Sequence, residues 1–260
     1  MNANSEIIDN RPVDLVVPLG PKTAWGEYEE LRYALRSAVC YVSNLRNVYV
    51  VGEKPSWLKK TAHLGFPDLH RRNKDANLIH KVLRACMLPE LSQKFIRMSD
   101  DQLFLADFSF SGHYYLKQLG PESFNRSPAK WYRRLRNTWK AIQQVFGKRY
   151  KSAERWNIYN FDAHIPMVYD KRVFREVVNM YPFVDPPGMC INTLYANHDP
   201  SPREKLPDGV RLGVAGPVSM HNLQQRCKKA LFCNYVDRGL TDVFKLFIQE
   251  KFPEPCRFER

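Results

Sequence analysis

Apolar runs and helical patterns alternate through the first hundred residues. Residues 13–20 read VDLVVPLG, an apolar run closed by proline and glycine, which is typical of a buried parallel strand that ends at a loop. Apolar residues at helical spacing follow within 27–42, and NVYVVG at 47–52 predicts a second strand. A strand, a helix and a strand in this order predict a βαβ unit with a right-handed crossover, and hence a parallel sheet.

The same alternation continues towards the C-terminus. Residues 73–88 predict a helix that begins at a favourable Asn cap and stops before a proline, and KFIRMS at 94–99 predicts a third strand. A long helix is predicted at 128–146. Later patterns predict a strand and turn at 160–171, helices at 172–181, 189–198 and 240–252, a loop at 200–209 and a strand at 210–216.

Two adjacent carboxylates, Asp100 and Asp101, follow the third predicted strand. Ligands of open α/β sheets bind at the carboxyl ends of strands, and successive strand residues point to opposite sides, so at least one carboxylate should emerge at the tip. A hard cation such as Mg²⁺ or Mn²⁺ would relieve their repulsion and could be shared with substrate phosphates. The alternative interpretation is a turn with an Asx-type hydrogen bond.

Composition narrows the class of protein. The 260 residues are 44% hydrophobic, enough for one large domain or for one domain with a substantial insertion. Lys and Arg number 40 against 27 Asp and Glu, a formal charge of +13 that favours a polyanionic partner, an anionic membrane surface or phosphate-bearing ligands, although solubility alone also explains it. The six cysteines form no CxxC pair, so neither a zinc site nor a disulfide framework is indicated.

The hydrophobic pattern of the sequence indicates neither a membrane helix nor a signal peptide. No apolar run approaches the roughly 18 residues of a membrane helix, and residues 1–11 lack the apolar core of a signal peptide. We therefore expect a cytoplasmic protein without a transmembrane segment.

Residues 127–156 combine cations with aromatic rings. Phosphate-binding cations and flat rings that stack on bases or sugars are typical of nucleic-acid binding. The alternative is a solvated amphipathic helix that buries its tryptophans. We name as candidate acceptor-binding residues Trp131, Arg133, Arg134, Lys140 and Arg149, together with His198 further along the chain.

Several longer words resemble the Stealth family of sugar-phosphate transferases. EELRYALRSA and YVSNLRNVYVVGEKPSWL, within 29–58, and LPELSQKFIRMSDDQLF at 88–104 are similar to its central region, which runs from an ELR-SLRS helix through a PSWL turn to a strand ending in NDD. FGKRYKSAERWNIYNFDAHIPMVYDK at 146–171 resembles its later region with an AH-P core, and EKFPEPCRFE at 250–259 resembles its closing FP-PS-FE. The similarity covers about half of the chain, in the family's order.

The resemblance implies a GT-A-like α/β fold and a transferase that uses a nucleotide-diphosphate sugar with Mn²⁺ or Mg²⁺. It implies that Asp100 and Asp101 bind the metal and the diphosphate, and it places His164 and Pro166 at the AH-P position. An imidazole there could ligate the metal, bind phosphate or act as general acid or base. A satisfied core histidine is the alternative for His164, and Asp162 is a second-tier candidate.

The chain also departs from the family. The first strand leads into VPLGPKTAWG where the family has a YTWVDG-type word, so the donor loop should be built differently, and Cys256 stands where the family has Ser. These differences leave open whether a sugar or a sugar phosphate is moved. The residues after the first strand nevertheless suggest donor binding by Pro18, Gly20, Lys22 and Arg32, although Lys22 and Arg32 are also explained as solvated surface charges.

We therefore predict a single GT-A-like domain with a mostly parallel central sheet, flanking helices and a helical basic insertion. Residues 12–107 would bind the nucleotide sugar, 108–156 would be the acceptor insertion, and 157–260 would complete the catalytic core. Asp101 and His164 are the predicted catalytic residues.

Three hypotheses about function follow. The first is a metal-dependent glycosyltransferase acting on a hydroxyl of a polyanionic acceptor, such as the hydroxymethylated bases of bacteriophage DNA, in which case the site of action is the host cytoplasm. The second is a Stealth-like hexose-1-phosphate transferase acting on a polysaccharide or glycan. The third is a non-catalytic nucleic-acid-binding protein on a transferase fold.

Overall fold

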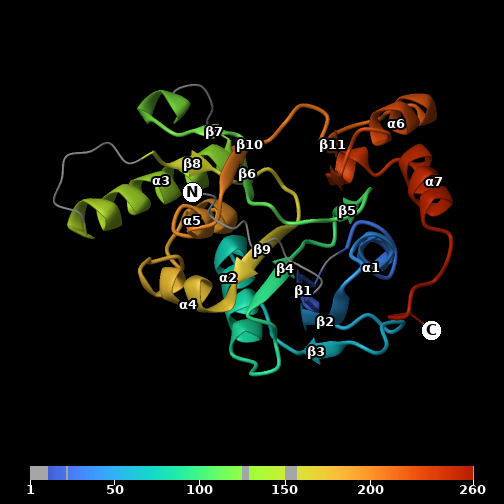
Figure 1. The fold of residues 1–260 in the computed structure, drawn as a ribbon, viewed down its shortest axis with the longest axis horizontal. Coiled ribbons are helices and arrows are strands. Elements are labelled where there is room, and N and C mark those ends of the chain that lie inside the picture. Colours follow the sequence, from blue (N-terminus) through green and yellow to red (C-terminus); the bar gives the residue numbers. More distant parts are fainter. Residues whose placement is uncertain (1–10, 22, 125–128, 150–156, 260) are drawn as a thin grey trace, which may run out of the picture.

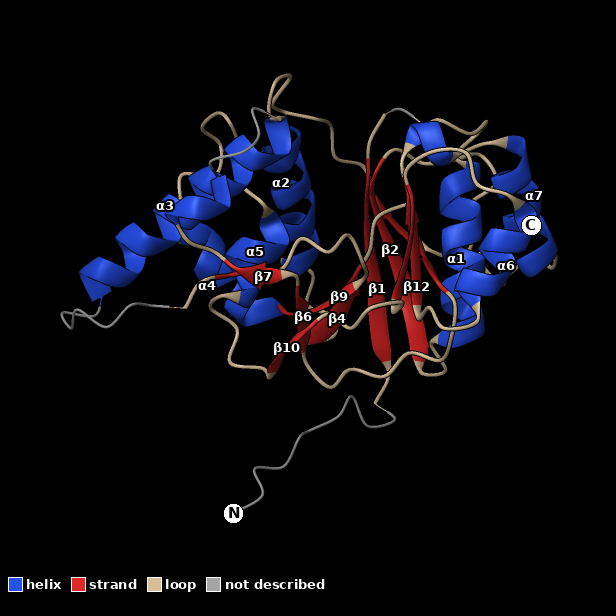
Figure 2. Ribbon diagram, turned by 90° about the horizontal axis from the view of Figure 1, so that it is seen from above, coloured by secondary structure: helices blue, strands red, loops and turns tan. Residues whose placement is uncertain are grey.

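The computed structural model describes residues 11–21, 23–124, 129–149 and 157–259. Its centre is a five-stranded sheet with helices on both faces (Figures 1 and 2). In spatial order the strands are β3 (Ala62–Leu64), β2 (Leu45–Gly52), β1 (Val13–Leu19), β4 (Lys94–Arg97) and β9 (Met167–Asp170). The first four are mutually parallel, and β9 pairs antiparallel with β4 at the edge. The predicted α/β fold with a mostly parallel central sheet is confirmed.

Strand β1 lies in the middle of this sheet because six of its seven residues are apolar and occupy both faces; the exception, Asp14, is buried in an ion pair with Arg46. All seven of its residues are buried. Leu15, Val17 and Leu19 pack in the core beneath α1 (Glu29–Tyr41), whereas Val16 packs in the core beneath α2 (Lys74–Cys86). Strand alternation thus distributes one short apolar run between two cores.

The remaining helices complete the two outer layers. Figure 2 shows α3 (Lys130–Arg149), α4 (Lys171–Asn179) and α5 (Ile191–Ala196) on the side of α2, and α6 (Met220–Cys227) and α7 (Asp242–Lys251) on the side of α1. Among the described residues, no helix is long and apolar enough to cross a bilayer.

Short strands join distant segments; the sequence predicted one of them, at 210–216, and not the others. Three form a second sheet, namely β11 (Arg211–Val214), β12 (Phe232–Tyr235) and β5 (Gln102–Phe104). Two further pairs are β10 (Arg203–Lys205) with β6 (His113–Tyr115), and β7 (Lys117–Gln118) with β8 (Tyr159–Asn160). Short 3₁₀ turns occur at Pro121–Phe124 and Asp237–Gly239.

These strands refine two predictions. The region 108–156, predicted to be a helical insertion, contains β6 and β7 as well as α3, and both strands pair with segments that follow it. The predicted loop at 200–209 contains β10. Strands of two or three residues carry too little periodicity to be recognised, and their pairing partners are distant in sequence.

The C-terminal segment is fixed to α1 by a buried ion pair. Arg36 donates through Nε and Nη2 to the two carboxylate oxygens of Glu259, both at 2.7 Å, and through Nη1 to the carbonyls of Phe252 and Pro253. Arg32 adds a contact of 3.1 Å to Glu259. Burial raises the pKa of Glu259, but the hydrogen bonds and charge of Arg36, with the Cys256 amide, outweigh burial and hold it below its ordinary value. We call the Arg36–Glu259 pair the C-terminal clamp.

Replacing Glu259 by Gln should destabilise the fold by about 3–5 kcal/mol near neutral pH, because it leaves the Arg36 guanidinium buried without its counter-ion. The folded-state pKa of Glu259 is lowered. The stability difference between wild type and variant should therefore have its full size above the ordinary pKa of about 4.3, and it should shrink as the pH falls through the folded pKa. Urea unfolding of both proteins at several pH values measures it. Glu254→Gln, an exposed change on the same segment, is the matched control; equal losses in both variants would refute the clamp.

Candidate functional site

The carboxyl ends of β1 and β4 lie side by side at the point where the sheet changes direction. Helix α1 follows β1 on one face, while α2 precedes β4 on the other. Such a switch point leaves a crevice at the strand ends, where open α/β sheets bind ligands. A cavity of about 490 Å³ occupies this position, and we call it the strand-end cavity. It is lined by Pro18, Gly20, Pro21, Asp68, His70, Arg71, Lys74, Asn77, Leu78 and Lys81.

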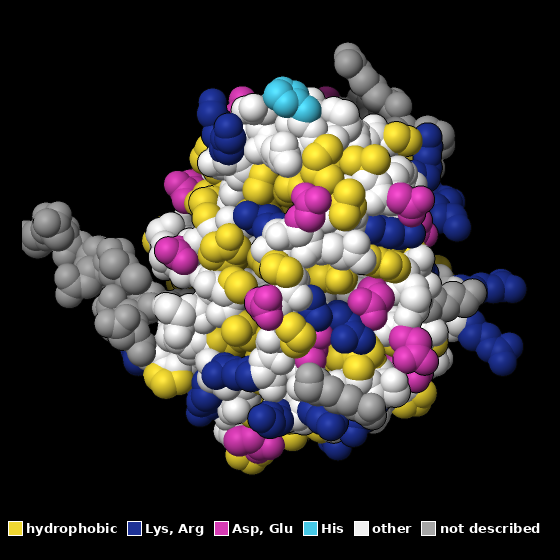
Figure 3. Space-filling view, turned by 90° about the vertical axis from the view of Figure 1, so that its right-hand side faces the viewer, with side chains coloured by type: hydrophobic (Ala, Val, Ile, Leu, Met, Phe, Trp, Pro, Cys, Tyr) yellow, Lys and Arg dark blue, Asp and Glu magenta, His cyan; other side chains and the backbone are white. Residues whose placement is uncertain are grey.

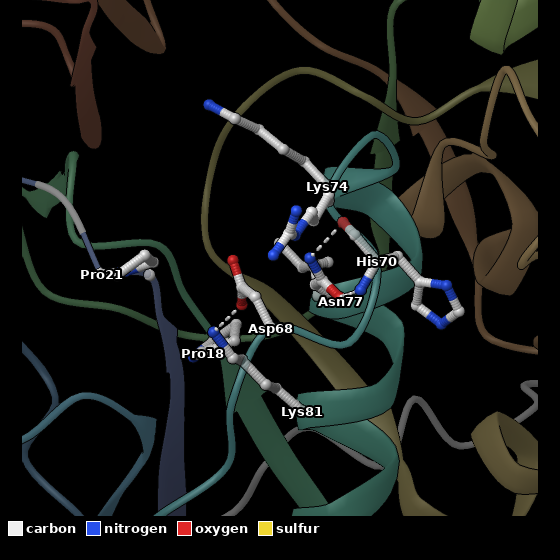
Figure 4. Close-up of a pocket in the computed structure, with 10 residues that line it drawn as sticks. Pro18, Pro21, Asp68, His70, Lys74, Asn77 and Lys81 are labelled. Atoms are coloured by element: carbon white, nitrogen blue, oxygen red, sulfur yellow. Dashed lines mark hydrogen bonds and ion pairs between the residues drawn. The ribbon is translucent and has the colours of Figure 1, made fainter.

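One wall of the strand-end cavity is fixed by Lys81 (Figure 4). Its buried ammonium donates to the carbonyl of Leu19 at 2.7 Å and to Asp68 Oδ1 at 2.6 Å. The pair ties the end of β1 to the segment before α2, and Asp68 is neutralised by it. Lys74, one turn before Asn77 on α2, extends away from the helix in Figure 4 and forms no ion pair within the described residues.

Asn77 shapes the rim of the same cavity. Its side chain accepts from the His70 amide at 2.8 Å and donates to the His70 carbonyl at 2.9 Å, as a neighbouring strand would. The His70 imidazole stacks on His80 with ring centroids 5.3 Å apart, and in Figure 4 it points away from the cavity. The segment that carries Asp68, His70 and Arg71 is therefore held in place by α2.

The residues predicted to bind the sugar donor differ in where they lie. Pro18 and Gly20 line the strand-end cavity. Lys22 lies outside the described residues. Arg32 is turned towards Glu29 and Glu259, at 3.0 and 3.1 Å, and lies over the Trp57 ring, so the C-terminal clamp accounts for its position. The cations that do line the cavity, Arg71, Lys74 and Lys81, were missed, although RRNKDAN at 71–77, across the start of the second predicted helix, was the available signal for the first two.

The acidic pair lies in the turn between β4 and β5 rather than on the strand itself. Strand β4 ends at Arg97, and the chain then turns into the second sheet. The position at the carboxyl end of β4 agrees with the sequence prediction, but strand alternation does not determine the directions of the two side chains. Asp100 and Asp101 are both half-buried.

Asp101 and His164 come together across the two sheets. His164 Nε2 lies 3.2 Å from Asp101 Oδ1, and the Asn234 amide nitrogen of β12 donates to His164 Nδ1 at 3.2 Å. An accepting Nδ1 leaves the proton of the neutral imidazole on Nε2, facing the carboxylate. His164 also has a φ of 56°, in the left-handed region that non-glycine residues seldom adopt. Backbone strain of this kind concentrates at functional sites.

Asp100 lies in a strongly negative environment. Burial, and then the charges of Asp101 and Glu30, raise its pKa to about 7. Glu30 also fixes the loop after β1, because its side chain accepts hydrogen bonds from the amides of Ala24 and Trp25 at 2.6 and 2.9 Å. Three carboxyl groups thus crowd the crevice between β1 and β4.

The residues present meet part of the requirement for a divalent cation. Asp101 Oδ1 is buried and has only the His164 imidazole as a neighbour for its charge among the described residues, Asp100 and Asp101 repel each other, and carboxylate oxygens are ligands that suit Mg²⁺ or Mn²⁺. The described residues contain no group of three or more His, Cys, Asp or Glu placed to hold a metal ion. A cation here would take its other ligands from substrate phosphates and water, as Mg²⁺ does.

In the basic and aromatic stretch, the tryptophans and the cations have different surroundings. Trp131 and Trp139 pack against the core beneath α3, and Trp139 contacts Phe124 with ring centroids 5.3 Å apart. For these rings the alternative interpretation, an amphipathic helix, describes the structure. Arg133 and Arg134 line a separate cavity, and Lys140 is exposed on the helix.

The remaining acceptor candidates do not join that cavity. His198 forms a hydrogen bond with Tyr181 and packs edge-on against Phe146, beneath α3. The side chain of Arg149 lies outside the described residues. Asp162, the second-tier candidate, accepts from Thr193; burial raises its pKa, opposed by that hydrogen bond and by the charges of Arg134 and Arg97.

Comparison with known proteins gives structural neighbours only. No protein-family model and no curated protein sequence matches the chain. Similar solved structures are mouse xyloside xylosyltransferase 1 (11% identity, TM-score 0.37, 89% of this chain and 99% of that one) and the bifunctional glycosyltransferase WbbM (10%, 0.44, 94% and 50%). An active-site mutant of LgtC is also similar (10%, 0.46, 94% and 98%). Likeness at this level assigns no activity, and the resemblance to the Stealth family remains a prediction.

Compared with the wild type, Asp100→Asn should be more stable at pH 8 than it is at pH 5. Because the folded-state pKa of about 7 exceeds the ordinary 3.8, ionisation of Asp100 costs stability as the pH rises between these values, and Asn removes that cost. The difference in melting temperature between variant and wild type should therefore shift in favour of the variant on going from pH 5 to pH 8. Asp107→Asn, at an exposed position on the same segment, should show no such shift. A pH-independent difference for Asp100→Asn would contradict the crowded carboxyl site.

Proposed function

We propose that the chain is a metal-dependent glycosyltransferase that uses a nucleotide-diphosphate sugar. The observation that carries the proposal is the pairing of two features at neighbouring strand ends. The strand-end cavity lies at the end of β1, and Asp101 with His164 lies at the end of β4, which is hydrogen-bonded to β1. A volume of about 490 Å³ is within the range of small-ligand sites, roughly 300–1,000 Å³.

Each part of the site suits one part of such a donor. Pro18, Gly20 and Pro21 offer an apolar wall to the base and ribose. Arg71 and Lys74 have cationic ends without ion pairs in the described residues, and these suit the diphosphate. Asp101, with Asp100 beside it, would hold the cation, which would stabilise negative charge on the departing diphosphate. Lys81 positions the wall rather than the donor, because Leu19 and Asp68 already occupy its ammonium.

The transfer itself balances simply. The acceptor hydroxyl oxygen forms a bond to the anomeric carbon, and the bond from that carbon to the diphosphate oxygen breaks. The electron pair leaves with the nucleoside diphosphate, and the hydroxyl proton is released to solvent. His164 carries its proton on Nε2, facing Asp101, and so orders this carboxylate rather than removing the acceptor proton.

Sugar-phosphate transfer is the second candidate, favoured by the unpaired cations that extend from the strand-end cavity towards α3. The two reactions release different products, because moving a sugar liberates a nucleoside diphosphate and moving a sugar phosphate liberates a nucleoside monophosphate. A donor labelled in both the sugar and the β-phosphate separates them.

A thermal-shift screen of nucleoside diphosphates and nucleotide sugars, with and without Mn²⁺, tests the proposal. We expect at least one nucleotide to raise the melting temperature, and to raise it further when Mn²⁺ is present. Asp101→Asn should abolish the additional, metal-dependent increase because it removes a charged ligand.

Asp107→Asn is the control, since it removes one carboxylate from an exposed position on the same segment. It should retain the metal-dependent increase in full. The proposal fails if no nucleotide shifts the wild type, or if Asp101→Asn and Asp107→Asn behave alike.

A further inference from the structure

A second cavity, of about 680 Å³, lies between the N-terminal ends of α2 and α3. We call it the basic cavity. It is lined by Arg71, Arg72, Asn73, Lys74, Asp75, Lys130, Arg133, Arg134 and Pro187. Six of these nine residues are cations and one is an acid, so the cavity has a strong excess of positive charge.

Among the described residues, five of the six cations have no internal counter-ion. The sixth, Arg134, forms an ion pair with Asp75 Oδ1 at 2.5 Å. Within the described part of the chain no ion pair reaches the others, all exposed, namely Arg71, Arg72, Lys74, Lys130 and Arg133. Like charges gathered in a concave surface repel one another and attract anions. The N-terminal end of α2 adds its positive helix dipole to the same side.

The floor of the basic cavity is built before any ligand binds. Asn73 accepts from the Ala76 amide at 3.0 Å and donates to the Val184 carbonyl at 3.0 Å, which joins α2 to the segment before Gly188. Gly188 has a φ of 92°, and a Cβ there would lie 2.6 Å from Asp75 Oδ2. A tightly packed floor of this kind fixes the backbone at the start of α2, from which several of the cations extend.

The basic cavity adjoins the strand-end cavity. Arg71 and Lys74 line both. An anionic molecule in the basic cavity would therefore have one end beside the place proposed for the donor diphosphate. That is the position an acceptor has to take.

The lining also restricts the kind of anion. Single-stranded nucleic acids are bound by cations together with aromatic rings that stack on the bases. The described residues that line the basic cavity include no aromatic ring, and Trp131 and Trp139 of α3 are partly buried against the core instead. Guanidinium groups bind phosphate oxygens in pairs and require no base.

We propose that the basic cavity binds the phosphate groups of a phosphorylated saccharide, which is the acceptor. This inference rests on the proposed function, because it names the substrate that receives the sugar. It replaces the full length of the basic helix by a compact site, and it adds Arg71, Arg72 and Lys74 to the candidate acceptor residues.

The test measures acceptor binding and donor binding separately. The probe is a synthetic phosphodiester-linked oligosaccharide, compared with the same oligosaccharide without phosphate and with a single-stranded DNA of equal phosphate number. The test variant is Arg72→Gln with Lys130→Gln, because neither residue lines the strand-end cavity. The control is Lys228→Gln with Lys229→Gln, two exposed residues after α6 that give the same change in charge.

The control lies in a different electrostatic setting. On the side of the molecule that carries α6 and α7, Lys and Arg side chains alternate with Asp and Glu among apolar residues (Figure 3). A non-specific effect of net charge would weaken binding in both double variants, whereas a specific site would respond to one.

We expect the phosphorylated oligosaccharide to bind in a salt-dependent manner and the unphosphorylated one not to bind. The test variant should weaken binding roughly tenfold or more, as expected from two charge-assisted phosphate contacts, and the control less than about twofold. Nucleotide-induced thermal shifts should be the same in both variants and in the wild type. Loss of those shifts in every protein would refute the proposed function, whereas intact shifts without phosphosaccharide binding would refute only the acceptor.

Three other outcomes would overturn the inference. Equal weakening in both double variants would show binding to net charge alone. Equal binding of the unphosphorylated oligosaccharide would show that phosphate is not recognised. Tighter binding of DNA, lost in the Arg72 and Lys130 variant, would assign the cavity to nucleic acid and support the DNA-acceptor hypothesis instead.

Discussion

The complete burial of β1 is the constraint on which the rest of the structure depends. Both faces of this strand are buried and both of its edges are paired, with β2 on one side and β4 on the other. A strand enclosed in this way can present functional groups only at its ends. Because β4 runs parallel to it, the residues after both strands meet at one edge of the sheet. The strand-end cavity and the acidic turn are two consequences of the same enclosure.

The elements that bury many apolar residues could be predicted from the sequence. The runs that became β1 and β2, and the helical patterns that became α1 and α2, are long enough for their periodicity to be read. Strands β5 and β12 could not be predicted in this way. They are three and four residues long, and each is stabilised by a partner more than a hundred residues away. The turn that carries Asp100 and Asp101 exists because β5 leaves the central sheet to join that partner.

The candidate site was predicted in part for a similar reason. A carboxylate pair after a buried strand has a position that the sheet itself dictates, so Asp100 and Asp101 could be placed from sequence. The position of an arginine side chain is decided by the partners that it meets in the folded protein. Arg32 and Arg71 look alike in sequence, but Glu259 holds one in the C-terminal clamp while the other lines both cavities. The tryptophans of α3 were ambiguous for the opposite reason, since a ring can equally stack on a ligand or complete a core.

The C-terminal clamp has a consequence for the order in which the chain can fold. Arg36 and Glu259 are separated by 223 residues, so the bidentate contact closes a loop that includes most of the protein. During synthesis, α1 and β1 leave the ribosome long before their partner does, and the Arg36 charge has to stay hydrated until then. The face of the sheet beneath α1 therefore cannot reach its final packing until Glu259 has been made. Contacts of such long range slow folding, and here a segment made long after α1 is the one that closes the core beneath it.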